Sequence, residues 1–376
     1  MNVGIPKEIK NHEYRVGATP SVVKLLVQAG HKVLVQTGAG TKIGFPDELY
    51  ASAGAKIVQT AGEAYAAEMI VKVKEPQDSE FPFLREGQIL FCFLHLAPDP
   101  KQLKELIEKK VVGIAYETVT DTSGRLPLLT PMSEVAGRIA IQAGATALQL
   151  INGGKGLLLG GVPGVAPAKV VILGGGVVGT HAARMAMGAG ADVTILETKL
   201  SRLRELDDLY APRLKTLYAN SVSIEESVKD ADLFVGAVLV PGKKTPKLIS
   251  EELVKKMSLG SVIVDVAIDQ GGCVETARPT THTDPTYILH GVVHYCVANM
   301  PGACARTSTQ ALSNATAPYI LAIASNGWAA AMLNDAGLKE GLNVCFGKVT
   351  NSFVASDCGY DYHPPEEFLS RVSVKS

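Results

Sequence analysis

The chain has 376 residues, of which 47% are hydrophobic and 19% are charged. At about 150 residues per domain, this length predicts two domains, each with enough apolar side chains for a core of its own. The 36 lysines and arginines balance 37 aspartates and glutamates. No basic tract occurs, so the composition argues against a nucleic-acid partner. No apolar run reaches the roughly 18 residues that a membrane helix needs, and we expect no membrane association.

The six cysteines are scattered and show neither a CxxC pair nor the spacing of a metal site. We therefore predict no bound metal. The first residues lack a secretory signal pattern, so we expect a reducing, cytoplasmic location. In that setting most of the cysteines are expected to be small core residues.

The first 116 residues alternate short apolar runs with helical patterns, which is typical of a parallel sheet with crossover helices. The predicted strands are residues 1–5, 31–36, 56–58, 69–76, 89–98 and 111–116, and the predicted helices are residues 20–29, 47–53 and 101–109. No glycine-rich nucleotide motif occurs in this part of the chain. We expect it to form an α/β domain that binds a different ligand from the rest of the protein.

A segment rich in turn-forming residues, 128–133, separates this part from a long predicted helix over residues 134–150. The length of this helix and its place between two sheets suit an interdomain connector. Further strands are predicted at residues 233–238, 261–267 and 291–296, and they supply the remainder of a Rossmann sheet.

From Ala303 onward the pattern is helical, over residues 309–323 and 328–336, and no further strand series is predicted. The stretch after Val344 has mixed polarity and receives no assignment. The simplest arrangement has the C-terminal helices packing on the first domain. We therefore predict an α/β fold of two Rossmann-like doubly wound domains, a discontinuous one of residues 1–129 plus 304–376 and a second of residues 130–303.

Residues 169–197 carry the strongest motif in the chain. An apolar run leads directly into Gly174-x-Gly176-x-x-Gly179, and a small-residue helix pattern and a second apolar run ending at Glu197 follow. In a strand–turn–helix unit these glycines give a tight turn, let the backbone approach a pyrophosphate and allow close helix packing. The carboxylate of Glu197 can accept from ribose hydroxyls and repels a 2′-phosphate, which favours NAD over NADP. The alternative is that the glycines only pack the unit.

Ligands of open α/β sheets gather at the carboxyl ends of the strands, which singles out several polar residues of the first domain. Lys72 and Lys74 alternate with valines and point from one face of their predicted strand, and Lys74 lies nearer the strand end. His95 lies near the end of an apolar run and is a candidate proton carrier. The competing interpretations are a solvated lysine and a core histidine. Arg15 could bind a substrate carboxylate through its planar fork, or form a surface ion pair.

The second domain offers a carboxylate and two further residues. Asp269 lies just past a predicted strand and before a Gln-Gly-Gly turn, whereas Asp265, of the same face parity, lies inside the strand. Position favours Asp269 as a functional group, and the alternative is a carboxylate that bonds only to its own turn. Asn299 and Met300 follow the last Rossmann strand and could contact a nicotinamide, or serve as a turn asparagine and a gap-filling methionine.

Together these segments closely resemble the alanine dehydrogenase family. The resemblance extends over nearly the whole chain, weakens after about Val344, and is carried by KEIKNHEYRVGATP, MIVKVKEP, LHLAP, LLTPMSEVAGR, LLGGVPGV, VILGGGVVGT, GAVLVPG, VIVDVAIDQGGC and GVVHYCVANMPGA. The related N-terminal portion of proton-pumping transhydrogenase shares the two-domain plan. The histidine in LHLAP and the lack of predicted membrane spans favour the dehydrogenase.

The resemblance implies the NAD-dependent interconversion of L-alanine with pyruvate and ammonia, with residues 1–129 plus 304–376 as the substrate domain and residues 130–303 as the NAD-binding domain. It implies that Arg15 and Lys74 hold the substrate, and that His95 and Asp269 transfer protons. The positions at which family members contact NAD correspond here to Ser133, Val178, Glu197, Arg202, Val238, Leu239, Asn299 and Met300, besides Gly174, Gly176 and Gly179.

Two rival functions stay open at this point. A soluble NAD(H)-binding transhydrogenase component would bind the dinucleotide without turning over alanine, and a non-catalytic NAD-binding regulatory protein would bind it without any activity. The resemblance also implies a homo-hexamer.

Overall fold

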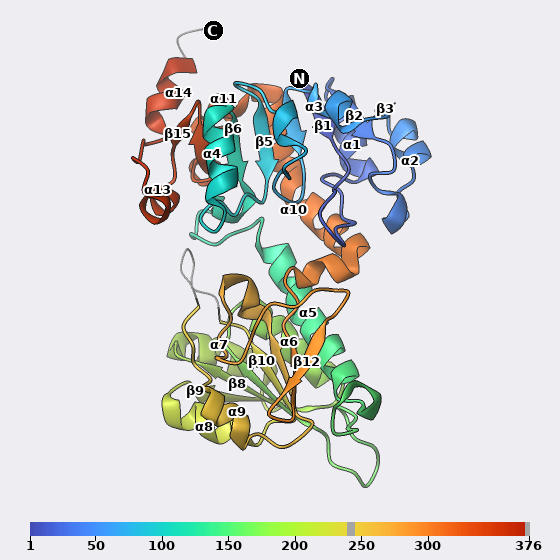
Figure 1. Cartoon of the computed structure of the whole chain (residues 1–376), viewed down its shortest axis with the longest axis vertical. Coiled ribbons are helices and arrows are strands. Elements are labelled where there is room, and N and C mark those ends of the chain that lie inside the picture. The colour runs from blue at the N-terminus through green and yellow to red at the C-terminus, as the bar shows by residue number, and fades with distance from the viewer. Residues whose placement is uncertain (239–244, 373–376) are drawn as a thin grey trace. The chain divides into compact units, whose positions relative to one another are not determined.

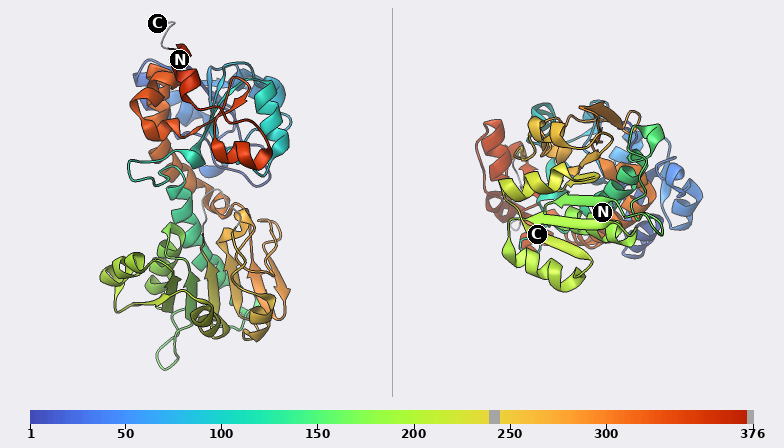
Figure 2. Two further views of the ribbon diagram at one scale, coloured as in Figure 1. Left: turned by 90° about the vertical axis from the view of Figure 1, so that its left-hand side faces the viewer. Right: turned by 90° about the horizontal axis from the view of Figure 1, so that it is seen from below.

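The computed structural model describes residues 1–238 and 245–372. It divides into two compact units, one made of residues 1–132 together with the chain from Cys304 onward, and the other of Ser133–Ala303. The first unit therefore draws on both ends of the sequence, as the blue and the orange-to-red segments of Figures 1 and 2 show.

Within the described residues, the sheet of the first unit has eight strands in the order β15-β14-β6-β5-β4-β1-β2-β3. The strands β1 to β6 pair in parallel, whereas β14 runs antiparallel to β6, and β15 antiparallel to β14. Their bounds are β1 (Asn2–Ile5), β2 (Lys32–Gln36), β3 (Lys56–Val58), β4 (Met69–Val71), β5 (Ile89–Cys92), β6 (Val112–Ala115), β14 (Leu342–Cys345) and β15 (Lys348–Val349).

Helices cover both faces of this sheet, because every central strand is apolar on both sides. Phe91 of β5 packs into one core with Leu26 of the first helix and Ile320 of the long C-terminal helix. Its neighbour Leu90 packs on the opposite side, with Leu103. The helices are α1 (Pro20–Gln28), α2 (Asp47–Ser52), α3 (Ala61–Tyr65), α4 (Pro100–Glu108), α10 (Ala305–Asn326), α11 (Trp328–Asn334), α12 (Ala336–Lys339), α13 (Ser352–Cys358) and α14 (Glu366–Val372), with short 3₁₀ turns η1 (Thr41–Ile43), η2 (Phe81–Phe83) and η3 (Tyr116–Thr118).

No further strand series was predicted after Ala303, and the stretch after Val344 had no assignment, but two strands occur there. Besides its helices, the C-terminal segment contributes β14 and β15, and β14 pairs with β6, more than two hundred residues earlier in the chain. Leu342–Cys345 is a short apolar run of the kind that periodicity alone cannot assign to a strand or a helix. Its partner comes from a distant part of the chain, so the strand is defined by tertiary contact.

Two strands of the first unit are shorter than predicted. β4 ends at Val71 and β5 at Cys92, although the predicted strands ran on to residues 76 and 98. Backbone bonds join the two segments as far as Lys72 and Phe93. After them carboxylates are the acceptors, because Glu8 accepts the N–H of Lys74 and Glu117 accepts the N–H of His95. The sheet ladder gives way to bonds with side chains at the edge where the candidate site residues lie.

Within the described residues, the second unit has a seven-stranded sheet in the order β12-β13-β11-β10-β7-β8-β9. It is parallel except for β12, an antiparallel edge strand. From β9 to β13 this is the Rossmann order, and the order reverses between β7 and β10. The strands are β7 (Lys169–Leu173), β8 (Asp192–Glu197), β9 (Leu214–Tyr218), β10 (Leu233–Gly236), β11 (Val262–Asp265), β12 (Thr286–Leu289) and β13 (Val292–Tyr295).

This sheet too is doubly wound. Val171 packs with Val228 and Val254 of the helices on one face. On the other face the last glycine of the motif lies against Ile172. The helices are α5 (Thr130–Ala147), α6 (Val177–Gly188), α7 (Leu200–Tyr210), α8 (Ser221–Lys229) and α9 (Glu251–Lys256), with 3₁₀ turns η4 (Leu150–Asn152), η5 (Val266–Gln270) and η6 (Met300–Cys304). The two sheets confirm the predicted α/β class.

The long helix α5 begins at Thr130, inside the segment 128–133 that was predicted to be a break. The prediction failed because Pro131 lies in the first turn, where a missing N–H and a fixed φ are compatible with a helix. Of the residues that the structure describes, none belongs to a helix long and apolar enough to cross a membrane.

Candidate functional site

Three candidate residues follow three neighbouring strands of the first unit. β1, β4 and β5 are adjacent and parallel, and Arg15, Lys74 and His95 come after them in turn. Parallel strands end at the same edge of a sheet, so the loops that carry these side chains start from one edge. Gly17 shows how closely the loops pack, since a Cβ at this position would lie 2.3 Å from the carbonyl oxygen of Val71.

Arg15 is buried, with 2% of its surface exposed. Its guanidinium donates to both carboxylate oxygens of Glu13, from Nε to Oε1 at 2.7 Å and from Nη2 to Oε2 at 2.5 Å. A third donor, Nη1, faces the sulfur of Met132 at 3.1 Å. This forked contact fixes the guanidinium plane, which suits a side chain that is to meet a planar carboxylate.

Lys72 and Lys74 differ in burial and in their partners. Lys72 is fully buried, and its Nζ lies 3.1 Å from an oxygen of Glu8 and 2.9 Å from one of Glu80. Burial by itself lowers the pKa of this ammonium, but the two carboxylates outweigh burial and raise the pKa above its usual value. Lys72 is therefore a charged structural residue, whereas the backbone of Lys74 is held by Glu8 and its side chain is only partly buried.

His95 is exposed and does not belong to the core, contrary to the core-histidine alternative. Its backbone has a φ of +46°, a left-handed conformation that non-glycine residues seldom adopt. The N–H of His95 donates to Glu117 Oε1 at 2.6 Å, and the same carboxylate accepts the N–H of Leu94 at 3.2 Å. Its ring stacks on Phe93 at 5.7 Å between centroids, and Nδ1 lies 3.9 Å from Glu117. The unusual backbone is therefore held in place by a carboxylate and a ring contact.

Sequence reasoning missed Glu8, Glu13 and Glu117. Each is a carboxylate that contacts a candidate residue or its backbone. Two of them lie in the polar N-terminal loop, where nothing in the pattern separates a buried acid from a solvated one.

The glycine turn of the second unit has the geometry of a dinucleotide site. Gly174 has a φ of +106°, and a Cβ there would lie 2.6 Å from the carbonyl oxygen of Ala237, at the point where the strand order reverses. A Cβ on Gly179 would lie 1.9 Å from the carbonyl oxygen of Gly174. At Gly176, the N-cap of α6, a Cβ would meet no atom of the described residues within 4 Å. Packing thus demands glycine at 174 and 179, and Gly176 is where a pyrophosphate can approach the backbone.

Glu197 and Arg202 both bond to the glycine turn. Glu197 Oε2 accepts the N–H of Gly175 at 2.8 Å, and Oε1 accepts the N–H groups of Thr198 and Lys199 at 2.8 and 2.9 Å. Partial burial raises the pKa of this carboxyl, but these hydrogen bonds outweigh burial and lower it overall. Arg202 donates from Nε to the carbonyl oxygen of Gly175 at 2.8 Å. An ionised acid therefore lies beside the turn.

Asp265 and Asp269 also have different roles. Asp265 is buried at the end of β11 and accepts the N–H groups of Cys273 and Val274 at 2.8 and 3.1 Å, so it organises the turn. Asp269 lies on η5 and is exposed. It accepts the N–H of Asn299 at 3.1 Å, and Asn299 has a φ of +62°. The predicted proton carrier and the predicted nicotinamide contact are thus neighbours.

The other predicted cofactor residues of this unit lie on separate elements. Ser133 lies on α5 one turn before Gly137, whose Cβ would lie 2.2 Å from the carbonyl oxygen of Val178 on α6. Val238 follows β10 beside Gly174, and Met300 begins η6 and is 2% exposed. The predicted residue Leu239 lies outside the described residues. The structure brings Val238 and Glu197 to the glycine turn, and Met300 directly follows Asn299 in the chain.

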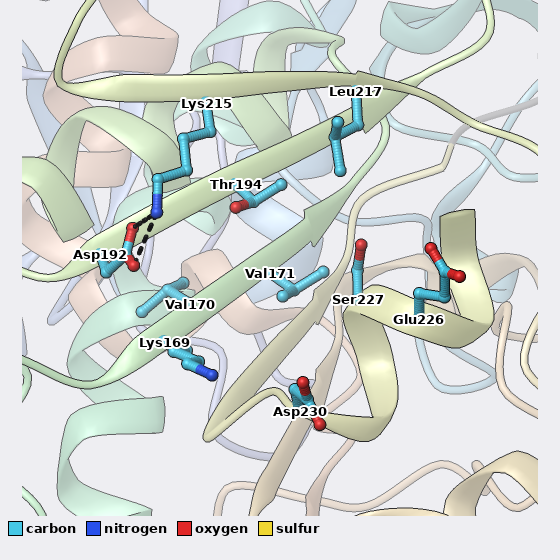
Figure 3. Close-up of a pocket in the computed structure, with 10 residues that line it drawn as sticks. All are labelled: Lys169, Val170, Val171, Asp192, Thr194, Lys215, Leu217, Glu226, Ser227 and Asp230. Carbon is cyan, nitrogen blue, oxygen red and sulfur yellow. Dashed lines mark hydrogen bonds and ion pairs between the residues drawn. The ribbon is translucent and has the colours of Figure 1, made fainter. Parts of the chain in front are cut away.

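A pocket at the opposite end of this sheet does not belong to the site. Lys169 and Asp192 are the first residues of β7 and β8, so the pocket lies at the amino ends of the strands (Figure 3). There Lys215 pairs with Asp192 at 2.7 Å. Elsewhere in the described residues, no group of three or more histidines, cysteines, aspartates or glutamates is arranged to hold a metal ion.

The second unit, with its Rossmann strand order, glycine turn and ionised Glu197, places the protein in the class of two-unit α/β proteins that carry a dinucleotide-binding fold. Residues 4–136 match the family described as alanine dehydrogenase/PNT, N-terminal domain, and residues 140–352 match its C-terminal domain. The chain belongs to the alanine dehydrogenase/PNT family, as its motifs predicted.

Known proteins are similar over the full length. The chain is 57% identical to the alanine dehydrogenase of Methanococcus maripaludis, over 98% of this chain and 100% of that one. It is 56% identical to the alanine dehydrogenase of Bacillus subtilis, over 99% of both chains. A solved L-alanine dehydrogenase has a TM-score of 0.92 at 52% identity, over 95% of this chain and 99% of that one. A Sinorhizobium meliloti transhydrogenase, at 23% identity and a TM-score of 0.82 over 93% of this chain and 100% of that one, shares the fold.

Proposed function

We propose that this chain catalyses the reversible NAD-dependent oxidative deamination of L-alanine to pyruvate and ammonia. The observation that carries the proposal is that Arg15, Lys74 and His95 follow three adjacent parallel strands, in a chain more than half identical to full-length relatives named alanine dehydrogenase. Family membership alone leaves the reaction open, because PNT proteins belong to the same family. The residues at this edge supply the chemistry that an amino acid needs.

Arg15 and Lys74 are assigned to substrate binding. The guanidinium, held in its plane by Glu13, would take the carboxylate of the substrate, and the ammonium of Lys74 would take the carbonyl oxygen of pyruvate. Two cations that grip the same small acid restrict its rotation, so that the Cα–H bond has one defined direction. This is catalysis by positioning.

His95 and Asp269 are assigned to proton transfer, and both side chains are exposed. In deamination the amine first loses a proton and the Cα–H bond breaks. Water then adds to the imine carbon, and the carbinolamine collapses to pyruvate and ammonia. A group that accepts a proton from the amine and from the attacking water is required, and a histidine and a carboxylate suit that task near neutral pH.

NAD is the proposed cofactor, and when bound it takes the hydride released from Cα. The glycine turn and the N-terminus of α6 would receive the pyrophosphate, and Glu197 would accept from the ribose hydroxyls. Asn299 and Met300 would contact the nicotinamide, with Ser133, Val178, Arg202 and Val238 lining the rest of the site. Residues 130–303 are accordingly the proposed NAD-binding domain, and residues 1–129 with 304–376 the proposed substrate domain.

We also propose a cytoplasmic homo-hexamer. Large apolar side chains are exposed close together in sequence in the second unit, among them Leu150 at 75%, Ile151 at 89% and Leu158 at 69%. Apolar exposure of this kind is typical of surfaces that subunits cover in an assembly. Sedimentation equilibrium of the purified protein tests the assembly, and a monomer at micromolar concentration would contradict it.

A coupled assay tests the proposed reaction. NADH formation is measured with alanine, serine, glycine or no amino acid, and NADH consumption is measured with pyruvate in the presence and absence of ammonium. We expect alanine to be the preferred substrate and ammonium to be required for pyruvate reduction. NADH binding without alanine turnover would instead favour a transhydrogenase component or a non-catalytic NAD-binding protein.

A further inference from the structure

Glu8 is a buried carboxylate whose two oxygens have different partners. Its Oε1 accepts the backbone N–H of Val73 at 2.7 Å and that of Lys74 at 3.2 Å. Its Oε2 accepts from the ammonium of Lys72 at 3.1 Å. Only 6% of the residue is exposed, so water does not compete for these contacts. One side chain thus connects the end of β4 to a buried cation.

Glu80 is a second buried carboxylate on the same cation, with 1% of its surface exposed. Its Oε1 accepts from Lys72 at 2.9 Å and from the hydroxyl of Tyr65 at 3.1 Å, while Oε2 accepts the N–H of Gln77 at 2.8 Å. Both acids therefore pair with Lys72, and both are buried. They differ in the backbone that they hold, because Glu8 contacts residue 74 itself and Glu80 contacts a residue beyond it.

We propose that Glu8 is a positioning residue for substrate binding, which orients Lys74 by holding its backbone N–H at the end of β4. This inference rests on the proposed function, in which Lys74 meets the substrate oxygen. Backbone bonds to the neighbouring segment continue as far as the N–H of Lys72, which donates to Phe91, and the carbonyl of Val73, which accepts from Phe93. At the N–H of Lys74 the acceptor is the carboxylate of Glu8. A charged acceptor holds an N–H more firmly than a carbonyl does, and Lys72 in turn anchors that carboxylate.

The test compares Glu8→Gln with Glu80→Gln as a matched control. An amide cannot keep all the contacts of either acid, because its NH₂ group must face either the ammonium of Lys72 or backbone N–H groups. Both variants therefore lose similar buried contacts. Thermal unfolding midpoints measure the loss of stability that the two variants have in common. Of the two acids, only Glu8 accepts the N–H of Lys74, together with that of Val73, whereas Glu80 holds the hydroxyl of Tyr65 and the N–H of Gln77.

The readouts are KM for pyruvate, KM for NADH and kcat in the amination direction. We expect Glu8→Gln to raise KM for pyruvate by about tenfold or more relative to Glu80→Gln, since small misplacement of a binding group is costly. KM for NADH should stay within about twofold of wild type in both variants. Equal KM values for pyruvate in the two variants, or a parallel rise in KM for NADH, would overturn the proposal.

A measurement on the wild-type protein covers the case in which Glu8→Gln does not fold. Hydrogen exchange of the Lys74 amide reports directly on its acceptor, and we expect exchange at least about tenfold slower than in an unstructured peptide. An unprotected amide would overturn the proposal. Failure of the proposed function looks different, because wild-type enzyme would then show no ammonium-dependent pyruvate reduction while the amide stayed protected.

Discussion

The carboxylate of Glu117 accepts the backbone N–H of His95 at 2.6 Å, at a position where His95 has a φ of +46°. A left-handed backbone at a non-glycine residue costs about 1–3 kcal/mol and persists only where its surroundings hold it. Glu117 supplies such a hold, and the stacking of the ring on Phe93 adds another. The unusual conformation aims the imidazole away from the core in which its sequence neighbours are buried.

His95→Ala should lower kcat by about 10²-fold or more if the imidazole transfers protons in the reaction. The side chain is exposed, so its removal should leave the fold intact. Steady-state rates with alanine and with pyruvate, at matched thermal unfolding midpoints, measure the effect. A rate close to wild type would remove His95 from the mechanism.

Glu117→Gln should lower kcat by about tenfold, less than His95→Ala, because the imidazole is retained but its backbone is held by a neutral amide in place of a charged acceptor. KM for NADH should not change, since Glu117 contacts residues 94 and 95 and belongs to the first unit. Full activity in this variant would show that Phe93 and the chain itself suffice to hold the conformation.

Glu197→Ala should relax the preference for NAD over NADP, because the ionised carboxylate that would repel a 2′-phosphate is removed. It should also weaken NADH binding, since the N–H of Gly175 loses its acceptor. Dissociation constants for NADH and NADPH, measured by fluorescence, test both effects. Glu225→Ala, which removes an exposed acid paired with Lys256 in the same unit, is the control. Unchanged discrimination would exclude the proposed role of Glu197.

Lys72→Met should destabilise the protein by about 3–5 kcal/mol, because removing one partner leaves two buried carboxylates without their cation. Denaturant unfolding followed by circular dichroism measures the loss. Lys101→Met, which removes an exposed ion pair with Asp78, should have little effect. Equal stability of the two variants would mean that the carboxylates take up protons or rearrange at small cost.

Because of His294, the free energy of unfolding should decrease as the pH is lowered below about 6.5, the usual pKa of histidine. The side chain is fully buried, and its Nδ1 faces the carbonyl oxygen of Val292 at 3.0 Å while Nε2 lies 2.8 Å from the hydroxyl of Thr276. Burial, followed by the charges of His290 and Arg278, lowers the pKa of His294 despite the bond to Val292.

The unfolded chain therefore takes up a proton before the folded one does, and its uptake favours unfolding as the pH falls from about 6.5 toward the folded pKa, by at most about 1.4 kcal/mol per pH unit. Above pH 7.5 the contribution of His294 is complete. Unfolding midpoints of wild type and His294→Phe between pH 5.5 and 7.5 test this, and the variant should show the shallower decline. Identical slopes would assign the acid sensitivity to other groups.

The glycine turn and most of the strands of the second unit could be predicted because their signals are local. Residues 169–197 carry strand, turn, helix and strand in one contiguous stretch. The choice of Asp269 over Asp265 as the exposed acid also followed from position along one strand.

The α/β class and the residues that follow each strand could be read from the sequence, since periodicity and glycine chemistry act over a few neighbouring residues. The pairing of Leu342–Cys345 with β6, and the burial of Lys72 between two acids, became visible only in the folded chain. The same holds for the contacts of Glu8 and Glu117 with the backbone at Lys74 and His95. An acid in a polar loop looks the same in sequence whether it is solvated or buried, because its partner depends on which strands lie side by side.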